Sequence, residues 1–425
     1  MEDPRRRTPR TDAVLTEPAV VAATERLGRA RVKAVVVAVL EDCRGGAVAP
    51  SEVVSVVLDR LPRAATSLRP VVNATGVVVH TNLGRAPLSA AAVEAVGLAA
   101  GATDVELDLG SGRRGPRGTG ALAALAAAVP DAGGVHVVNN GAAALSLVAC
   151  ALGQGREAVI ARGELVEIGD GFRIPELLES LGVRLREVGT TNRVRLADYE
   201  AAIGPETAFV LKVHPSNFRV EGFTSAVPVS ELRGLGPPVV VDIGSGLLAP
   251  HPRLPDEPDA ATMLRDGAAL VTASGDKLLG GPQCGLLLGE AALVQALRRH
   301  PFARALRVDK LTLAALEATL TGPPPPVVAA LATRPEDLMD RARRIAAAVG
   351  GTAVPSEGRV GGGGAPGVPL PSAAVALSPD RAKALRLGDP AVVGHVHDGR
   401  LLLDLLTVPE ELDDVVIEAV RRAAP

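Results

Sequence analysis

The residue with the greatest chemical potential in this sequence is a lysine in an unusual setting. Lys277 lies within SGDKLLGGP, residues 274–282, which follows the short apolar run Ala268–Val271. A lysine between an apolar run and a Gly-Gly-Pro turn is expected at the mouth of a site rather than on a solvated helix face. A partly desolvated amine loses its proton more easily and becomes a nucleophile toward carbonyl carbon.

A carboxylate at the end of a predicted strand supplies a partner for this lysine. The run Val239-Val240-Val241-Asp242 is typical of a buried parallel strand that ends in an acid. Enzymes that use pyridoxal 5'-phosphate (PLP) need both groups, because the lysine forms a Schiff base with the coenzyme and the aspartate keeps the pyridine nitrogen protonated. Each residue alone is more often a surface charge. Their order, and their positions after strands, favour PLP.

A phosphate site is predicted in VNNGAAAL, residues 138–145, where a strand is followed by the start of a helix. Free backbone N–H groups at Asn140, Gly141 and Ala142, together with the helix dipole, suit a bound phosphate. Ser274, three residues before the lysine, could add a hydroxyl. Turns of this kind are common, and this one is assigned to a phosphate because PLP carries a phosphate group that the protein must hold.

Arginines form the other group with recognisable chemistry. Arg304 and Arg307 are spaced to lie on one helix face, and Arg85 lies in a glycine-containing loop before a helix. Guanidinium groups suit tetrahedral oxyanions, although surface arginines of a helix give the same pattern. The basic loop RRGPRG, residues 113–118, is either a mobile lid near an anion or a solvated loop.

Further polar residues near strand ends have less specific roles. Glu164 and Glu167 fall in RGELVEIG, residues 162–169, which justifies a site hypothesis without assigned functions. His80 and His214 also follow predicted strands, and a hydrogen-bonded structural histidine is the default interpretation of each.

Composition sets the broad class. The 425 residues are 47% hydrophobic and 22% charged, which is typical of a globular rather than a disordered chain. The net charge of −3 does not by itself indicate a nucleic-acid partner. The three isolated cysteines show no metal spacing and fit a reducing cytoplasm, so no metal site is predicted. No apolar run is long enough to span a membrane.

The first 70 residues differ slightly from the rest, with twelve Arg or Lys and nine Asp or Glu. Arg5, Arg6, Arg7 and Arg10 cluster at the start, where they form either a solvated tail or a contact to a phosphate backbone. Apolar segments alternate with charge over residues 12–62 and predict a small helical domain.

Residues 118–310 alternate between helices and short, non-alternating strands, which is typical of a parallel α/β sheet covered on both faces. The run GPPPP at 322–326 predicts a stiff break, and the glycines at 361–364 predict a flexible loop within a smaller C-terminal α/β domain. The expected domains are residues 1–64, helical; 65–310, coenzyme-binding; and 311–425, small and α/β.

Several of these motifs together resemble one family, the bacterial selenocysteine synthases, or L-seryl-tRNA(Sec) selenium transferases. The resemblance runs from about residue 10 to the C-terminus. Its motifs are NATG at 73–76, HTNLGR at 80–85, RGELVEIG at 162–169, EVGTTNR at 187–193 and SGDKLLGGPQ at 274–283.

The resemblance implies a fold-type I PLP-dependent transferase, similar to aspartate aminotransferase, with a small N-terminal helical domain and a C-terminal α/β domain. It implies that Lys277 carries PLP, that Asp242 holds the pyridine nitrogen, and that Arg85, Arg304 and Arg307 surround selenophosphate. It also implies that the N-terminal domain recognises seryl-tRNA(Sec), and that the chain forms a cytoplasmic homo-oligomer, a decameric ring of dimers in the family.

The implied reaction is β-elimination from seryl-tRNA(Sec) to an aminoacrylyl-tRNA, followed by addition of selenium. The chain departs from the family at three positions. Gly141 replaces an asparagine and Cys284 an alanine, two small changes that should be tolerated. Leu406 replaces an arginine, which puts only a peripheral C-terminal contact in doubt.

Two other functions stay open at this stage. One is a PLP lyase that acts on a small amino acid or sugar acid without tRNA, which should lack the N-terminal domain or the arginines. The other is a non-catalytic RNA-binding scaffold, which an intact Lys277 and Asp242 argue against.

Overall fold

The structure is a computed structural model that describes residues 8–169 and 171–423. The chain divides into two compact units, one ending at Pro70 and the other beginning at Val71. Arg5, Arg6 and Arg7 lie outside the described residues, so their contact to a phosphate backbone stays a prediction.

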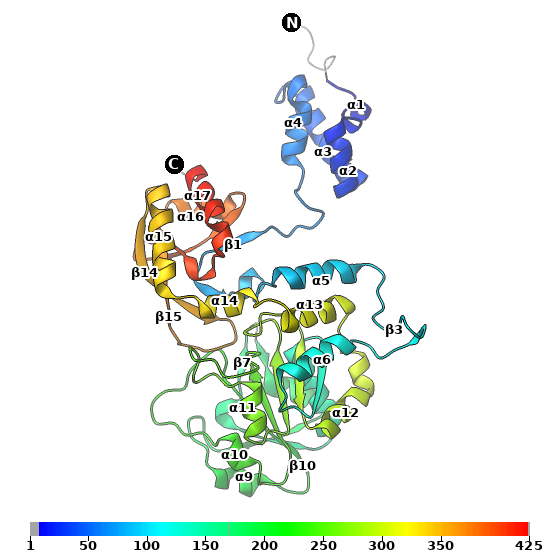
Figure 1. Ribbon diagram of the computed structural model, residues 1–425, viewed down its shortest axis with the longest axis vertical. Helices are drawn as coiled ribbons and strands as arrows, with labels where there is room; N and C mark the ends of the chain where they lie inside the picture. Colours follow the sequence, from blue (N-terminus) through cyan, green and yellow to red (C-terminus); the bar gives the residue numbers. More distant parts are fainter. Residues whose placement is uncertain (1–7, 170, 424–425) are drawn as a thin grey trace. The chain divides into compact units, whose positions relative to one another are not determined.

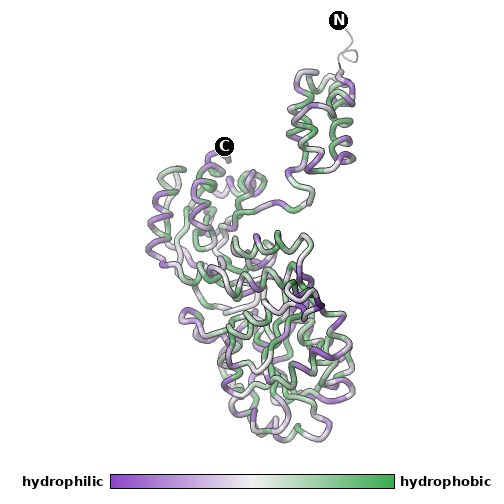
Figure 2. The backbone as a smooth tube through the Cα atoms, turned by 45° about the vertical axis from the view of Figure 1, so that its right-hand side comes forward, coloured by the Kyte–Doolittle hydropathy of each residue, from purple (hydrophilic) through white to green (hydrophobic). Residues whose placement is uncertain are grey.

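The N-terminal unit is all-helical. Its α-helices are α1 (Thr11–Leu15), α2 (Pro18–Leu27), α3 (Arg29–Arg44) and α4 (Val53–Arg60). Val32, Val36 and Val57 are fully buried in its core, at spacings that place them on the inner faces of α3 and α4. Figure 2 shows the hydrophobic and hydrophilic stretches alternating along these helices. The unit therefore has a small core of its own.

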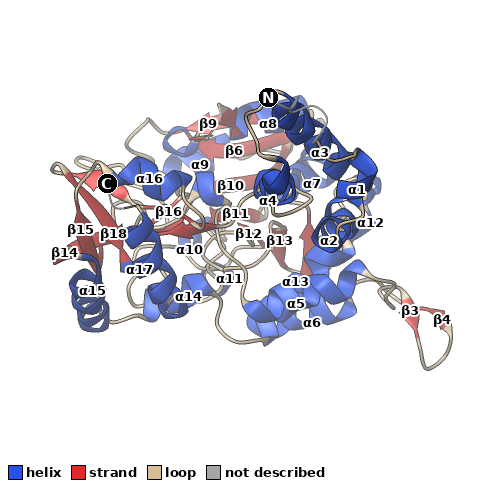
Figure 3. Cartoon of the chain, turned by 90° about the horizontal axis from the view of Figure 1, so that it is seen from above, coloured by secondary structure: helices blue, strands red, loops and turns tan. Residues whose placement is uncertain are grey.

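The larger unit is built around a seven-stranded sheet, whose strands follow one another in Figure 3. In spatial order they are β5 (Gly134–Val138), β13 (Gly285–Gly289), β12 (Leu270–Ser274), β11 (Val239–Gly244), β10 (Thr207–Val213), β6 (Glu157–Ala161) and β9 (Arg184–Val188).

Strand β13 corrects the expectation of an all-parallel sheet. It runs antiparallel to both β12 and β5, whereas β12, β11, β10, β6 and β9 are parallel neighbours. Only residues 275–284 connect β12 to β13, and a parallel crossover needs about a dozen residues or more. The chain must therefore turn back at this point, and Lys277 lies in the turn.

Helices cover both faces of this sheet, as the continuous apolar strands predicted. Val240 packs on one face with α7 (Gly141–Val148), α8 (Ile174–Ser180) and α12 (Ala291–Arg299). Val239 and Val241 pack on the other face with α6 (Thr119–Ala128), α9 (Leu196–Ala202), α10 (Val229–Leu232), α11 (Ala260–Arg265) and α13 (Lys310–Thr321). A strand with apolar residues on both sides suits only a sheet buried in this way.

The C-terminal part of the larger unit forms a second lobe with its own sheet, beside which α15 and α17 lie in Figure 1. Its strands in spatial order are β17 (His395–His397), β18 (Arg400–Asp404), β15 (Leu370–Leu377), β14 (Thr352–Gly361) and β2 (Val77–Val79). Its helices are α14 (Pro326–Ala332), α15 (Pro335–Val349), α16 (Arg381–Leu387) and α17 (Asp413–Arg422).

Two short strands at the start of the larger unit belong to this lobe. Strand β2 pairs in parallel with β14, and β1 (Val71–Asn73) pairs with β16 (Ala391–Val393). The chain then enters α5 (Ala90–Ala100) and a hairpin of β3 (Leu107–Asp108) and β4 (Arg113–Arg114) before reaching the large sheet. A further hairpin joins β7 (Glu167–Ile168) to β8 (Phe172–Arg173).

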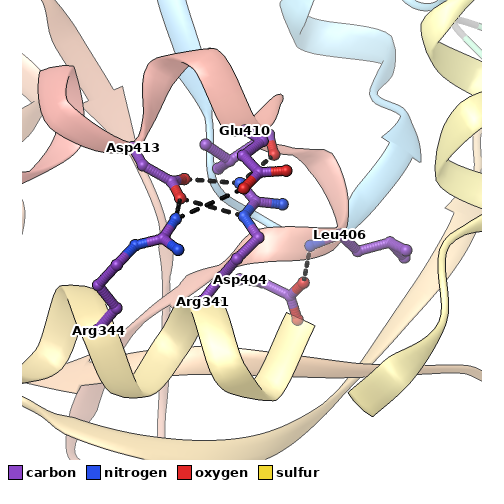
Figure 4. A network of polar contacts seen from close by, with 7 residues as sticks. Arg341, Arg344, Asp404, Leu406, Glu410 and Asp413 are labelled. Atoms are coloured by element: carbon purple, nitrogen blue, oxygen red, sulfur yellow. Dashed lines mark hydrogen bonds and ion pairs between the residues drawn. The ribbon is translucent and has the colours of Figure 1, made fainter. Parts of the chain in front are cut away.

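A buried acid organises the C-terminal lobe. Asp404 is fully buried and accepts hydrogen bonds from the Ser356 hydroxyl at 2.6 Å, the Ser372 hydroxyl at 2.7 Å and the Leu406 backbone N–H at 3.0 Å. Figure 4 shows it beside a second group, in which Asp413 accepts from both Arg341 and Arg344. The Leu406 side chain is buried in the lobe's core, so this departure from the family lies in the interior rather than at the periphery.

Among the described residues, no helix combines the length and apolarity needed to cross a membrane.

We predict that Asp404→Ala destabilises the protein by about 3 kcal/mol, because the substitution leaves the buried Ser372 hydroxyl, the half-buried Ser356 hydroxyl and the Leu406 N–H without this acceptor. Chemical unfolding followed by circular dichroism measures the change. Asp414→Ala, which removes an exposed acid from α17, is the matched control and should change stability little. Equal effects of the two substitutions would contradict the role given to Asp404.

Candidate active site

Lys277 lies in the turn between β12 and β13, at the carboxyl ends of the parallel strands. The turn is closed by hydrogen bonds from Gly280 N–H to the Lys277 carbonyl at 3.0 Å and from Leu278 N–H to the Ser245 carbonyl at 2.8 Å. Burial lowers the pKa of the Lys277 amine, although the carboxylates of Asp242 and Asp276 act in the opposite direction. The amine is thus held in the desolvated setting that the sequence predicted.

Asp242 is buried beside this lysine, at the end of β11. Its Oδ1 accepts from the Thr272 hydroxyl at 2.9 Å and from the Gly244 N–H at 3.3 Å. Thr272 is its cross-strand neighbour on β12, so the sheet register itself sets the contact. Burial raises the pKa of Asp242, while Thr272 and the Lys277 amine lower it. A cationic group opposite this acid would therefore be strongly favoured.

The residues predicted to hold a phosphate, called the cradle below, lie at the start of α7. The Asn140 side chain caps the helix by accepting from the Ala143 N–H at 2.8 Å. The first N–H groups of the helix, at Gly141 and Ala142, have no acceptor within the helix itself. The Ser274 hydroxyl lies 2.6 Å from the position that a Cβ on Gly141 would occupy. The structure thus brings Asn140, Gly141, Ala142 and Ser274 together.

Arg85 lies next to the lysine turn. Its guanidinium contacts the Asp276 carboxylate at 2.5 Å, and the following residue, Ala86, donates its N–H to the Asp276 carbonyl at 3.2 Å. Arg85 itself has a left-handed backbone with φ of 68°, which is uncommon for a residue with a side chain. Its side chain remains 40% exposed and can still meet a ligand.

Arg304 and Arg307 do not lie on one helix face as expected, because the helix ends at Arg304. Arg304 ends the short 3₁₀ helix Pro301–Arg304, and the backbone of Arg307 bridges to Val138 just before the Asn-Asn turn. Both are exposed, but only Arg307 has an acidic partner among the described residues, Glu106 at 3.6 Å. The contacts of the three arginines therefore do not join them into one cluster.

Glu106 also organises the basic loop at residues 113–118. It accepts hydrogen bonds from Arg114 at 2.8 Å and from Arg117 at 3.2 Å, and these two contacts lower its pKa. The loop contains strand β4 of the β3–β4 hairpin, and Glu106 links it to Arg307. The two predicted interpretations of this loop, a mobile lid near an anion and a solvated loop, both stay predictions.

The other polar residues have mostly structural contacts. Glu164 is buried, pairs with Lys212 and accepts from the Val213 N–H at 3.1 Å, which ties the 162–169 segment to β10. Glu167 pairs on the surface with Arg173 at 2.7 Å. The Cys284 side chain packs against Gly275. Burial raises the pKa of its thiol to about 12, so the thiol is not poised as a nucleophile.

The glycine loop, residues 361–364, is a part of the site that the sequence did not reveal. We expected a flexible stretch, but the loop connects β14 to β15 directly against Lys277, and a Cβ on Gly363 would lie 2.6 Å from the lysine Nζ. His214 and Glu257, which contact each other at 3.3 Å, lie beside it. A run of glycines signals a close approach of backbone, but not its partner.

These residues fit PLP. The cradle has a space that a glycine Cβ would fill, with a hydroxyl beside it, and suits a phosphate. Asp242 is a buried acid at a strand end and suits a protonated ring nitrogen, while Lys277 supplies the amine.

Comparison with known proteins gives a consistent result. Residues 71–409 match the family model described as L-seryl-tRNA selenium transferase, and residues 5–44 match selenocysteine synthase N terminal. The chain is 46% identical to the L-seryl-tRNA(Sec) selenium transferase of Moorella thermoacetica, covering 84% of this chain and 83% of that protein. It is 40% identical to the one of Hyphomonas neptunium, covering 99% and 98%.

Among solved structures, the chain resembles D-glucosaminate-6-phosphate ammonia-lyase with a TM-score of 0.61 and 20% identity, over 84% of this chain and 96% of that one. At this identity the likeness concerns the fold alone. It confirms the predicted fold-type I architecture.

We predict that Asp242→Asn changes the pH dependence of stability of the coenzyme-free protein. Because burial raises the Asp242 pKa, the folded state binds this proton more tightly than the unfolded chain, whose pKa is about 3.9. The resulting stabilisation is present below that value and is lost as pH rises through the folded pKa. Thermal unfolding over a pH series should therefore show the variant gaining on the wild type as pH rises, and parallel curves would contradict the assignment.

Proposed function

This chain belongs to the L-seryl-tRNA selenium transferase family, as its motifs predicted, and we propose that it converts seryl-tRNA(Sec) to selenocysteinyl-tRNA(Sec) with PLP as coenzyme and selenophosphate as selenium donor. The observation that carries this proposal is the desolvated Lys277 amine between Asp242 and the glycine loop. When bound, PLP supplies the electron sink through which the seryl hydroxyl leaves and selenium adds.

The coenzyme residues divide the work of binding and proton transfer. Lys277 would hold the coenzyme through its aldehyde, and its amine would serve as the base for the α-proton of the seryl group. Its lowered pKa supports this, because a base must be unprotonated before it can act. Asp242 holds the proton on the ring nitrogen, and Asn140, Gly141, Ala142 and Ser274 hold the phosphate.

Selenophosphate is assigned to the arginines around the cradle. Arg85, Arg304 and Arg307 each have an exposed guanidinium or a partly exposed one, and guanidinium groups bind tetrahedral oxyanions through paired hydrogen bonds. Asp276 pairs with Arg85 next to the lysine turn, and Glu106 pairs with Arg307. The support for this assignment is the chemistry of the three guanidinium groups and the family match.

We assign recognition of the tRNA to the N-terminal helical unit. It matches the N-terminal family model, carries a small basic excess and has a core of its own. Lys33 and Arg29 lie exposed on α3, where they can reach a phosphate backbone.

A homo-oligomer is the assembly that the exposed apolar residues support. Val93 and Leu98 of α5 are 59% and 72% exposed, and Leu109 of the β3–β4 hairpin is 73% exposed. Leu98 also lines a cleft of about 750 Å³ together with residues of α6 and α13. Exposed apolar side chains in such a group favour burial by another subunit. We place the protein in the cytoplasm as a ring of dimers, with seryl-tRNA available there and its thiols reduced.

The alternative lyase function is less well supported. The ammonia-lyase is 20% identical and shares the fold alone, whereas the curated relatives at 40% to 46% identity are selenium transferases.

The purified protein, given PLP, selenophosphate and seryl-tRNA(Sec), should yield selenocysteinyl-tRNA(Sec). In Arg304→Ala/Arg307→Ala we expect the KM for selenophosphate to rise by about 10²-fold, because two charge-assisted contacts are lost, while the KM for seryl-tRNA changes little. Selenium transfer should slow more than loss of the seryl hydroxyl.

The matched control is Arg298→Ala/Arg299→Ala, which removes two exposed arginines from the end of α12. An equal rise of both KM values in the cradle variant, or the same effect in the control, would reject the oxyanion role.

Deletion of residues 1–70 should weaken tRNA binding while PLP stays bound. The unit boundary at Pro70 makes this a clean truncation. Filter binding of seryl-tRNA and the visible absorbance of the protein measure the two properties. Unchanged tRNA affinity would contradict the assignment of the N-terminal unit.

A further inference from the structure

The glycine loop approaches Lys277 more closely than any side chain would permit. A Cβ on Gly363 would lie 2.6 Å from both Cε and Nζ of the lysine, and one on Gly364 would lie 3.0 Å from Leu278 Cδ1. Gly363 also has φ of +88°, a conformation that favours glycine. On the other side of the amine, a Cβ on Gly244 would lie 3.7 Å from Nζ. The amine is thus enclosed by backbone from the large sheet and from the C-terminal lobe.

A single buried acid holds the end of this loop. Ala365, the residue after the loop, has a left-handed backbone with φ of 43°, which costs free energy for a residue with a Cβ. Its N–H donates to Glu257 Oε2 at 2.6 Å. The same oxygen lies 3.3 Å from Nε2 of the His214 ring. The backbone N–H of His214 donates to the backbone carbonyl of Asp242 at 2.9 Å. Glu257 therefore connects the loop to the strand that carries Asp242.

The environment of Glu257 is not that of a surface residue. Its side chain is only 1% exposed, and Oε1 has no hydrogen-bond partner among the described residues. Burying a carboxylate is costly, so the contacts that it makes must be worth that cost to the folded site. Arg219 and Asp256 line the small cavity of about 150 Å³ next to it, and His214 is its one titratable hydrogen-bond partner.

We propose that Glu257 is a positioning residue that fastens the glycine loop over the Lys277 amine, so that the C-terminal lobe closes the coenzyme site. The contact with Lys277 follows from the geometry alone. Only its consequence for the coenzyme rests on the proposed function.

The physical effect of this contact is to keep water away from the amine. Burial is the main cause that lowers the Lys277 pKa; Arg85 also lowers it, whereas Asp242, Asp276 and Glu257 raise it. Releasing the loop would hydrate the amine and raise its pKa, whereas removing only the charge of Glu257 would lower it. Glu257→Ala does both, and the hydration effect is the larger because burial is the first cause of the Lys277 pKa shift and the Glu257 charge the smallest of those that act on it. Glu257→Gln removes only the charge, because an amide oxygen still accepts from the Ala365 N–H.

The test is the pH dependence of Lys277 acetylation by acetic anhydride in the coenzyme-free protein, followed by mass spectrometry of the lysine peptide. In Glu257→Ala we expect the midpoint to rise by about one pH unit. In Glu257→Gln it should not rise. Gly363→Ala should raise it too, because the added methyl group and the end of the lysine cannot both keep their positions, and either displacement opens the cover over the amine. We also expect Glu257→Ala to weaken PLP binding about tenfold, and Glu257→Gln to restore it.

Two controls match these variants. Asp256→Ala removes the neighbouring exposed acid, and Gly399→Ala imposes a methyl group at φ of +68° with nothing within 4 Å. Neither should move the midpoint. An unchanged midpoint in Glu257→Ala overturns the proposal; should that variant not fold, an equal midpoint in Gly363→Ala and Gly399→Ala overturns it instead. Shifted midpoints in a protein that never binds PLP contradict the proposed function but not the role of Glu257.

Discussion

An amine that must react with a carbonyl carbon has to leave water without losing access to its partner, and this requirement shapes the larger unit. Lys277 lies where the carboxyl ends of the parallel strands meet a loop from another sheet. Burial there lowers the pKa of the lysine and raises that of Asp242, so in the coenzyme-free site burial disfavours the charged form of both groups. A ligand whose aldehyde bonds the amine and whose protonated ring nitrogen faces the carboxylate would offset this cost for both, which is a physical reason for the site to bind it.

The turn between β12 and β13 and the register of the strands position these groups. The short turn from β12 to β13 reverses the chain and lifts Lys277 above the sheet edge, while the register of β11 with β12 sets Thr272 against Asp242. The C-terminal lobe then supplies the cover. Because β2 pairs with β14, the backbone that leads to Arg85 and the backbone that leads to the glycine loop leave the same part of that lobe. Both reach the lysine turn from the same sheet.

Much of this could be predicted from the sequence, because the signals are local. Apolar runs predicted the sheet strands, and the SGDKLLGGP motif predicted a partly desolvated lysine, which burial in the turn between β12 and β13 supports. Family resemblance supplied the arginines. The predicted direction of β13 was wrong, because an apolar pattern does not show which way a strand runs. Only the short connection from β12 to β13 indicates that the chain turns back.

The missed residues are those whose partners are distant in the sequence. Glycines 361–364 were expected to be flexible, yet Gly363 contacts a lysine that precedes it by more than eighty residues. Glu257 carries no local signal, since an acid in a proline-rich segment usually lies on the surface. The role of Lys277 is tested most directly by reducing the purified protein with borohydride in the presence of PLP and locating the added mass by mass spectrometry. We expect a phosphopyridoxyl group on Lys277; the same mass on another lysine, or no added mass, would contradict this role.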